Sequence, residues 1–216
     1  MACHYYLYQG VFRKMDLLHL FHAGGFMMYP LLLCSIIVVT IFIERVRFYH
    51  ANRSNIEKLT KEIPELLTAN DQEGLKAALK ADGGIPAGVI LSGAEQLSSK
   101  ANQTAILEGA ASHAAGVLKS YLNYLDVIVT LSPLMGLLGT VIGMIGSFNV
   151  LSVEEGQPFA ITGGVAEALV CTASGLFVAI IALIAYTYLS QQVSNFVSQM
   201  EKLGSLYLAI VEADQK

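Results

Sequence analysis

The sequence has no tryptophan and few charged residues. Charged side chains make up 14% of its 216 residues, 54% are hydrophobic, and the mean hydropathy is +0.55. Soluble domains carry about 25% charged residues, so this balance indicates a membrane protein. With a net charge of only −4 and no run of like charges, the sequence offers nothing that would attract a nucleic-acid partner.

Cysteine and histidine are too few and too scattered for a disulfide framework or a metal site. The three cysteines are Cys3, Cys34 and Cys171, and the last two lie in apolar runs, where a thiol behaves as a small hydrophobic group. We interpret the one candidate histidine pair, His19 and His22, as interfacial rather than metal-ligating. We therefore expect no disulfide, no metal and no cofactor.

Catalytic motifs are missing as well. The sequence contains no Gly-rich phosphate loop, no Cys/His cluster and no Ser/His/Asp set at a recognisable spacing. We therefore expect that the protein is not an enzyme.

Long uncharged stretches are what the sequence does have. The first, residues 26–43, would form about 27 Å of helix, close to the roughly 30 Å hydrocarbon core of a bilayer. It ends at Glu44-Arg45 without a small-residue cleavage site, which favours a retained anchor over a signal peptide. Two later stretches exceed the length that a span requires.

We predict an all-α integral membrane protein with three transmembrane helices and long cytoplasmic helical extensions. The predicted segments are an N-terminal outside segment (1–25), transmembrane helices at 26–46, 124–151 and 161–189, a cytoplasmic helical loop (47–123), a short outside loop (152–160) and a C-terminal cytoplasmic helix (190–216).

The distribution of basic residues sets this orientation. Nine of the thirteen lysines and arginines lie in residues 44–126, from the end of the first span to the start of the second, whereas the 152–160 loop has none. The positive-inside rule therefore places the long loop and the C-terminus in the cytoplasm. Arg13 and Lys14 lie on the translocated side, against this bias, which leads to the hypothesis that translation begins at Met15. The sequence leaves both Met1 and Met15 open as the start.

The long loop is predicted to be helical. Residues 54–82 have the pattern of short amphipathic helices, which we expect to break at Pro64 and at "DGGIP" (82–86). From Ala87 to Tyr124 a helical pattern with many small residues runs almost unbroken into the second span. The loop should therefore form a helical bundle that extends the membrane helices.

Small residues recur at helical spacing along one face of each later span. In the second span they are Gly136, Thr140, Gly143 and Ser147, with Gly139 and Gly146 beside them. In the third span they are Ala168, Thr172, Gly175, Ala179 and Ala182. Such faces let membrane helices approach closely, so we expect a helix-packing role for Gly136, Gly139, Gly143 and Gly175. Cys171 and Val178 lie off this face, and we expect substitutions there to be close to neutral.

Packing alone does not account for Glu167. A carboxylate inside a membrane costs roughly 2.5 kcal/mol or more, so it normally faces a bundle interior or a wet cavity and marks an ion or proton path. Because Glu167 lies within two turns of the expected helix start, a solvated interfacial position is the alternative.

Three stretches resemble the MotA/TolQ/ExbB proton channel family, specifically its ExbB and TolQ branch. They are "GGFMMYPLLLCSIIVVTIFIERV" (24–46), "LSPLMGLLGTVIGMIGSF" (131–148) and "AEALVCTASGLFVAI" (166–180). They cover all three spans in the family's order, with a cytoplasmic loop of suitable length between the first two. The Glu44-Arg45 pair matches the family's "ER".

The resemblance implies a subunit of the bacterial cytoplasmic membrane, so that segments 1–25 and 152–160 would be periplasmic. It implies a homo-oligomer, by family precedent a pentamer, around a pore that holds the single spans of an ExbD- or TolR-like partner. The family's pore-facing polar residues fall on Thr140, Thr172 and Glu167. A TonB- or TolA-like protein would receive the energy, with TonB-type uptake favoured.

The resemblance also implies a mechanism. Protons moving down the membrane potential release roughly 2.3 kcal/mol per charge per 100 mV. Protonation of the partner's aspartate would free its helix to turn, and hydroxyls such as those of Thr140 and Thr172 would hold the deprotonated form.

Two alternatives stay open from the residues alone. A passive membrane scaffold would use the small-residue faces only to oligomerise, with Glu167 solvated at the interface. A MotA-like stator subunit would share the chemistry, although that branch usually has four spans. The sequence does not separate a TonB-type client from a Tol-type client, or protons from sodium ions.

Single-cysteine labelling tests the predicted topology. Cysteines placed at residues 52–119 and 200–216 should react only with reagents that reach the cytoplasm, and those at 153–158 should react from outside. Labelling of the long loop from the periplasmic side would overturn the orientation.

Overall fold

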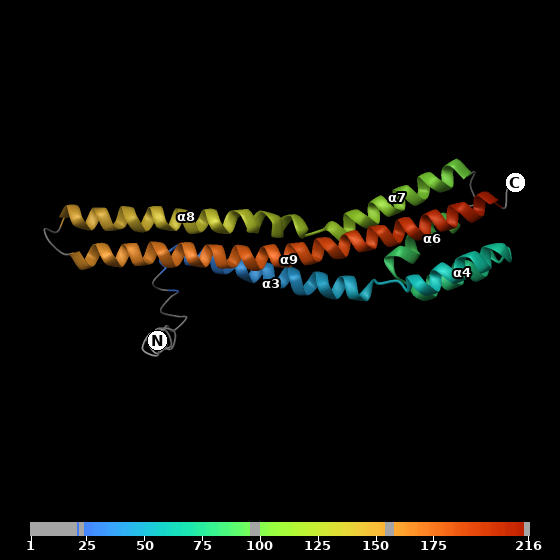
Figure 1. Ribbon diagram of the computed structural model, residues 1–216, viewed down its shortest axis with the longest axis horizontal. Helices are drawn as coiled ribbons and strands as arrows, with labels where there is room; N and C mark the ends of the chain where they lie inside the picture. Colours follow the sequence, from blue (N-terminus) through green and yellow to red (C-terminus); the bar gives the residue numbers. More distant parts are fainter. Residues whose placement is uncertain (1–20, 22–23, 96–99, 154–157, 214–216) are drawn as a thin grey trace, which may run out of the picture. The chain divides into compact units, whose positions relative to one another are not determined.

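The computed structural model describes residue 21 and residues 24–95, 100–153 and 158–213. Within these residues the regular structure is helical and no strand occurs. The helices are α3 (Met28–Ala51), α4 (Ile56–Thr68), α5 (Gln72–Asp82), α6 (Ile85–Glu95), α7 (Lys100–Lys119), α8 (Leu122–Val153) and α9 (Pro158–Ala213) (Figure 1). The predicted all-α fold class is confirmed.

Several expectations concern the remaining residues. The start at Met15, Cys3 and the pair His19 and His22 lie outside the described residues, as do positions 154–157 of the predicted periplasmic loop. Within the described chain, two stretches are long and apolar enough to cross a membrane, Gln103–Phe148 and Thr162–Val211. Since α3 is not among them, the count of three spans stays a prediction.

The chain divides into two compact units. Unit 1 consists of Met1–Thr40 and Tyr124–Ala185, and unit 2 consists of Ile41–Asn123 and Tyr186–Lys216. Helices α4 to α7 belong to unit 2, whereas α3, α8 and α9 contribute residues to both units.

Unit 1 exposes large apolar side chains and buries small ones. The exposed set includes Leu134, Leu137, Ile145 and Phe148 on α8 and Leu169, Phe177, Ile180 and Ile184 on α9. The buried set on α9 includes Ala168, Cys171, Ala179 and Ala182. Water-soluble monomers rarely expose apolar surface on this scale, whereas lipid covers it at no cost. The pattern is that of helices packed through small residues within a bilayer.

In unit 2, the start of each of the helices α4 and α5 is fixed by an N-terminal cap, and each helix buries one apolar face. The Asn55 side chain accepts a hydrogen bond from the Lys58 amide at the start of α4, and Asp71 does the same for Gly74 at the start of α5. Helix α5 ends at Gly83, whose φ of 68° suits a glycine C-cap. The break predicted at "DGGIP" is therefore confirmed.

The break predicted at Pro64 is wrong, because Pro64 lies inside α4. A proline there removes one amide donor and leaves the Thr60 carbonyl without its helical partner. The helix continues because Leu59 and Ile63 are buried on one face, so that tertiary packing outweighs the local propensity. The Thr68 hydroxyl also donates to the Pro64 carbonyl at 2.7 Å.

The pattern expected to run almost unbroken into the second span is interrupted at Tyr121. This residue has a φ of 66°, a left-handed conformation that is costly for a side chain with a Cβ. It separates α7 from α8. A contact from another helix therefore has to stabilise this break.

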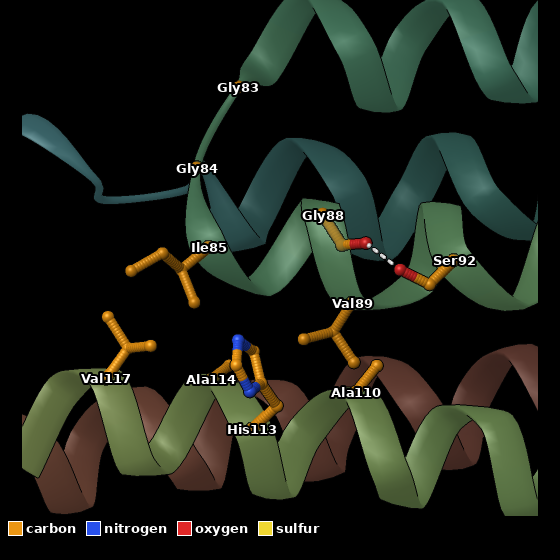
Figure 2. Close-up of a pocket in the computed structure, with 10 residues that line it drawn as sticks. All are labelled: Gly83, Gly84, Ile85, Gly88, Val89, Ser92, Ala110, His113, Ala114 and Val117. Atoms are coloured by element: carbon orange, nitrogen blue, oxygen red, sulfur yellow. Dashed lines mark hydrogen bonds between the residues drawn. The ribbon is translucent and has the colours of Figure 1, made fainter.

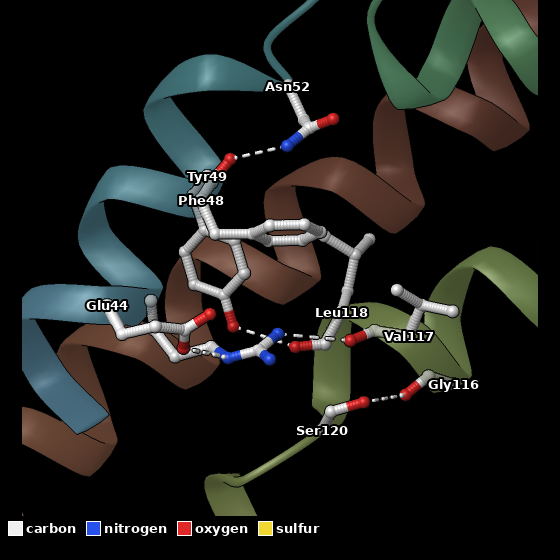
Figure 3. A network of polar contacts seen from close by, with 9 residues as sticks. Glu44, Phe48, Tyr49, Asn52, Gly116, Val117, Leu118 and Ser120 are labelled. Carbon is white, nitrogen blue, oxygen red and sulfur yellow. Dashed lines mark hydrogen bonds and ion pairs between the residues drawn. The ribbon is translucent and has the colours of Figure 1, made fainter.

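That contact comes from Arg45 and Tyr49 of α3 (Figure 3). Arg45 is 5% exposed; its Nη1 donates to the Val117 carbonyl at 3.2 Å, and its guanidinium carbon lies 4.6 Å from the centre of the Tyr121 ring. The Tyr49 hydroxyl donates to the Leu118 carbonyl at 2.8 Å. These carbonyls belong to the last turn of α7, where the amides of a continuing helix are missing and positive charge is favoured. The Val117 carbonyl also accepts the Ser120 amide at 3.3 Å. Two side chains of α3 thus cap α7 and hold the break.

The protonation states suit this arrangement. Burial raises the pKa of Tyr49, an effect that Arg45 partly offsets, so the phenol stays neutral and can donate at physiological pH. The Nε of Arg45 lies 2.8 Å from Oε2 of Glu44, at an angle that gives an ion pair but no hydrogen bond.

Replacing Pro64 by alanine tests the account of α4. The Pro64→Ala variant regains an amide donor for the Thr60 carbonyl, so α4 should become more stable by about 2 kcal/mol. Hydrogen exchange of the α4 amides in the solubilised protein should slow by about 30-fold if they exchange through local opening. Glu65→Ala is the matched control with no change expected, and unchanged exchange in Pro64→Ala would contradict the account.

Candidate functional site

Within unit 1, α8 and α9 approach each other most closely at Gly136 and Gly175. A Cβ on Gly175 would lie 2.6 Å from the Ser132 carbonyl oxygen and 3.0 Å from the Gly136 Cα. A Cβ on Gly136 would lie 3.1 Å from the Thr172 Cα. Backbone atoms cannot yield as a flexible side chain can, so position 175 requires glycine, and position 136 has little room for anything larger.

A second close contact lies further along the same two helices. A Cβ on Gly143 would lie 3.0 Å from the Gly164 carbonyl oxygen and 3.3 Å from the Ala168 Cβ. A Cβ on Gly164 would overlap the Ser147 hydroxyl. The two antiparallel helices therefore stay in contact over several turns.

Cys171 belongs to this contact, so the expectation that it lies off the packing face is wrong. It is fully buried, and its Sγ occupies the space that a Cβ on Gly139 would need. The packed positions of α9 are 164, 168, 171 and 175, which recur at i, i+4, i+7 and i+11. The predicted series included Thr172 in place of Cys171, and Thr172 lies at the edge of this face.

Both threonines use their hydroxyl protons within the protomer. The Thr172 hydroxyl donates across the contact to the Gly136 carbonyl at 3.2 Å. The Thr140 hydroxyl donates to the Leu137 carbonyl of its own helix at 2.6 Å. Since a hydroxyl has one proton and two lone pairs, each threonine presents only acceptors to any further group.

Glu167 is half-buried, and its carboxylate lies against the backbone that precedes α3. A Cβ on Gly25 would overlap Oε1 of Glu167, and Gly25 has a φ of +67°. Both the conformation and the contact therefore require glycine at position 25. The Gly25 carbonyl accepts the Met28 amide at 3.2 Å and forms the turn that starts the helix.

These contacts fix the relative depth of the three predicted site residues. Thr140 lies between the pairs Gly139–Cys171 and Gly143–Ala168, whereas Glu167 lies just beyond the second pair. On antiparallel helices Thr140 is therefore about three residues, or roughly 4.5 Å, further along the contact than Glu167. Thr172 lies five residues from Glu167, about 7.5 Å along α9. Gly25 immediately precedes the apolar run of α3, which places Glu167 near one end of that run. A carboxylate at the boundary with hydroxyls deeper along the contact is an arrangement through which protons can be exchanged.

Sequence reasoning missed Ser132, Gly164 and Gly25. Ser132 is fully buried at the closest approach, and it extends the series of the second span by four residues toward the N-terminus. Gly164 extends the series of the third span in the same way. The helical spacing was a sufficient signal for both, whereas the contact of Gly25 with Glu167 depends on tertiary structure.

Other sites offer less chemistry. Among the described residues no group of three histidine, cysteine, aspartate or glutamate side chains could hold a metal ion. In unit 2 a pocket of about 410 Å³ lies between α6 and α7, lined by small and apolar residues, with the His113 ring pointing into it (Figure 2). His113 is the one titratable side chain among its lining residues.

Comparison with known proteins decides the family. Residues 71–202 match the MotA/TolQ/ExbB proton channel family. The chain is also 32% identical to an ExbB-like biopolymer transport protein of Synechocystis sp. over 192 residues, which cover 86% of this chain and 91% of that protein. The chain belongs to the MotA/TolQ/ExbB family. This is a family of membrane proton channels and not of enzymes.

More distant relatives support the same assignment. The Tol-Pal system protein TolQ of Pseudomonas aeruginosa is 36% identical over 95 residues, which cover 44% of this chain and 41% of that protein. The structure of MotAB from C. jejuni has a TM-score of 0.67 and 17% identity, and it covers 98% of this chain and 86% of that chain. The latter likeness shows that the fold of the family is present.

Substitution of Gly175 tests the closest contact. Gly175→Ala forces a methyl group against the Ser132 carbonyl and should destabilise the protein by about 1–3 kcal/mol. For a chain of this size the midpoint of thermal unfolding in detergent should fall by about 2–4 °C per kcal/mol.

Gly146→Ala is the matched control. A Cβ there meets nothing within 4 Å, so the helix propensity of alanine should leave the midpoint unchanged or slightly raised. Equal midpoints for the two variants would contradict the geometry.

Proposed function

We propose that this chain is the ExbB/TolQ-like subunit of a motor in the inner membrane that is driven by the proton motive force. It would conduct protons together with an ExbD/TolR-like partner. The observation that carries the proposal is the half-buried Glu167 carboxylate beside the Gly143–Ala168 pair, with Thr140 and then Thr172 further along the α8–α9 contact, in a member of a proton channel family.

The proposed assembly is a homo-oligomer, a pentamer by family resemblance, around the single spans of the partner. The exposed apolar surface of unit 1 leaves room for both lipid and neighbouring subunits. The N-terminus would be periplasmic and the C-terminus cytoplasmic. The energy would pass to a TonB- or TolA-like protein, with TonB-type uptake favoured because relatives named for biopolymer transport match most of the chain.

The hydrogen bonds of the two threonines refine the proton step. Each hydroxyl already donates to a backbone carbonyl and therefore offers lone pairs. A protonated carboxyl group of the partner can donate to such a lone pair, whereas a carboxylate needs a donor. In this arrangement the threonine hydroxyls accept a hydrogen bond from the partner's protonated carboxyl group. To bind the partner's carboxylate, a hydroxyl must first break its hydrogen bond to the backbone carbonyl, which costs about 1 kcal/mol.

Glu167 has a complementary role in this scheme. It lies near one end of the apolar run of α3, where a carboxylate can take protons from water and pass them to the partner's carboxylate. The neutral acid that this forms then donates a hydrogen bond to the deeper threonines. The membrane potential supplies roughly 2.3 kcal/mol per charge per 100 mV, which exceeds the cost of one such switch.

A passive scaffold is the second candidate, and one observation favours it. The Thr172 hydroxyl bonds to Gly136 across the α8–α9 contact, which is also what a purely structural threonine would do. The two functions differ in which substitutions abolish activity and which abolish assembly.

The decisive experiment removes the polar groups and keeps the shape. Thr172→Val should leave insertion and assembly intact, at a stability cost of about 1 kcal/mol for the lost hydrogen bond, and should abolish energy transfer. Glu167→Ala should also abolish energy transfer. Glu167→Gln removes the charge but keeps the ability to form hydrogen bonds, so its activity shows which of the two properties matters. Client activity that depends on the proton motive force is measured beside assembly on native gels.

Thr130→Val is the matched control. Its hydroxyl also donates to carbonyls of its own helix. Thr130 lies ten residues from Thr140, about 15 Å along α8 and outside the proposed proton path, so activity should be unchanged. Full activity in both Thr172→Val and Glu167→Ala would contradict the channel proposal. Loss of assembly in Thr172→Val would support the scaffold.

A further inference from the structure

A polar crevice lies in unit 2 between the end of α3 and α9. One part, of about 240 Å³, is lined mainly by Arg53, Gln192, Asn195, Ser198 and Gln199. An adjoining part, of about 80 Å³, is lined by Arg53 and Gln192 together with Val46, Tyr49, His50 and Tyr188. Because Arg53 and Gln192 line both parts, we treat them as one site, the Arg53 crevice.

The Arg53 crevice is rich in hydrogen-bond donors. Among the described residues, no hydrogen bond or ion pair engages the Arg53 guanidinium or the Gln192 amide. The Asn195 Oδ1 accepts a hydrogen bond from Gln191 at 3.2 Å, which leaves its amide NH₂ group as a donor. No carboxylate lines either part. A guanidinium fork with amide and hydroxyl groups around it, and no acid to neutralise it, is suited to a phosphate group.

The backbone that carries Arg53 is held in place by the start of α6. The Asn52 carbonyl accepts the Ile85 amide at 3.1 Å, and the Ser54 hydroxyl accepts the Ala87 amide at 3.2 Å. A Cβ on Gly84 would lie 2.8 Å from the Arg53 carbonyl carbon. The turn is thus fixed on both sides of Arg53, so a ligand does not have to order it.

The adjoining part of the crevice presents one aliphatic and one exposed aromatic side chain beside its polar lining. Val46 lines it, Tyr188 is exposed there, and the Tyr188 ring centre lies 6.0 Å from that of Phe42. Tyrosine at the end of an apolar run is typical of the membrane interface, where the polar layer on each side is about 5–8 Å thick. Tyr188 precedes Gln192 by about one turn, so the donors begin where headgroups are expected.

We propose that the Arg53 crevice binds the phosphate in the headgroup of an anionic phospholipid. The acyl chains of this lipid would extend from the crevice alongside Val46 and Tyr188. A free phosphate ion would satisfy the same donors but would leave Val46 and the exposed Tyr188 ring uncovered. The uncompensated positive charge of Arg53 selects an anionic headgroup over a zwitterionic one. The proposal uses none of the residues of the proton path, so it stands or falls independently of the proposed function.

Native mass spectrometry of the full-length protein in detergent tests the site, with phosphatidylglycerol and phosphatidylcholine as probes. The wild type should prefer phosphatidylglycerol. Arg53→Gln should weaken its binding by about tenfold or more, because charge-assisted hydrogen bonds are lost. Gln192→Ala should weaken it by a smaller factor and provides a second variant should Arg53→Gln fail to assemble.

Arg47→Gln is the matched control, since Arg47 is an exposed arginine of α3 outside the crevice, and its binding should stay within about twofold of wild type. Equal losses in Arg47→Gln and Arg53→Gln would mean unspecific surface charge and would overturn the proposal. Wild-type affinity in Arg53→Gln would overturn it as well. Displacement of phosphatidylglycerol by inorganic phosphate at equal concentration would assign the site to the free ion and exclude the lipid.

Discussion

The packing of unit 1 depends on having glycine, with no side chain, at positions 136 and 175. In lipid there is no hydrophobic force between helices, so α8 and α9 are held by close packing and by the few polar bonds that close packing allows. The Thr172 hydroxyl reaches the Gly136 carbonyl because the two backbones are in contact. The same contact sets the levels of Thr140 and Glu167. Packing and the candidate proton path are therefore two properties of one interface.

Unit 2 depends on a different device, the capping of α7 by side chains of α3. Arg45 and Tyr49 supply donors to the last carbonyls of α7, and the guanidinium covers the Tyr121 ring at the left-handed break. Arg45 is half of the Glu44-Arg45 pair that resembles the family's "ER". Its place in the structure gives that motif a physical meaning, since a lysine would lack the planar fork that serves a carbonyl, a carboxylate and a ring together.

The helices and their small-residue spacing could be predicted from sequence because both follow from local pattern. The series through Gly136 and Gly143 indicated the right face of α8, and its extension would have found Ser132. The errors arose where tertiary contacts outweigh local rules. Pro64 stays inside α4 because Leu59 and Ile63 are buried. Tyr121 breaks a helical pattern because Arg45 stabilises the break. Cys171 lies in the α8–α9 contact because a helix has 3.6 residues per turn. The contact of Gly25 with Glu167 joins residues far apart in the chain, so no spacing could reveal it.

The burial of Cys171 gives the protein a built-in reporter of helix separation. Its thiol is free but 0% exposed, and it fills the space above Gly139. Alkylating reagents attack an accessible thiolate, so they have no route to this sulfur while α8 and α9 are in contact. Cys34, 6% exposed, is similarly shielded. The rate at which Cys171 is alkylated therefore measures how often the two helices part, without a cysteine having to be introduced by mutation.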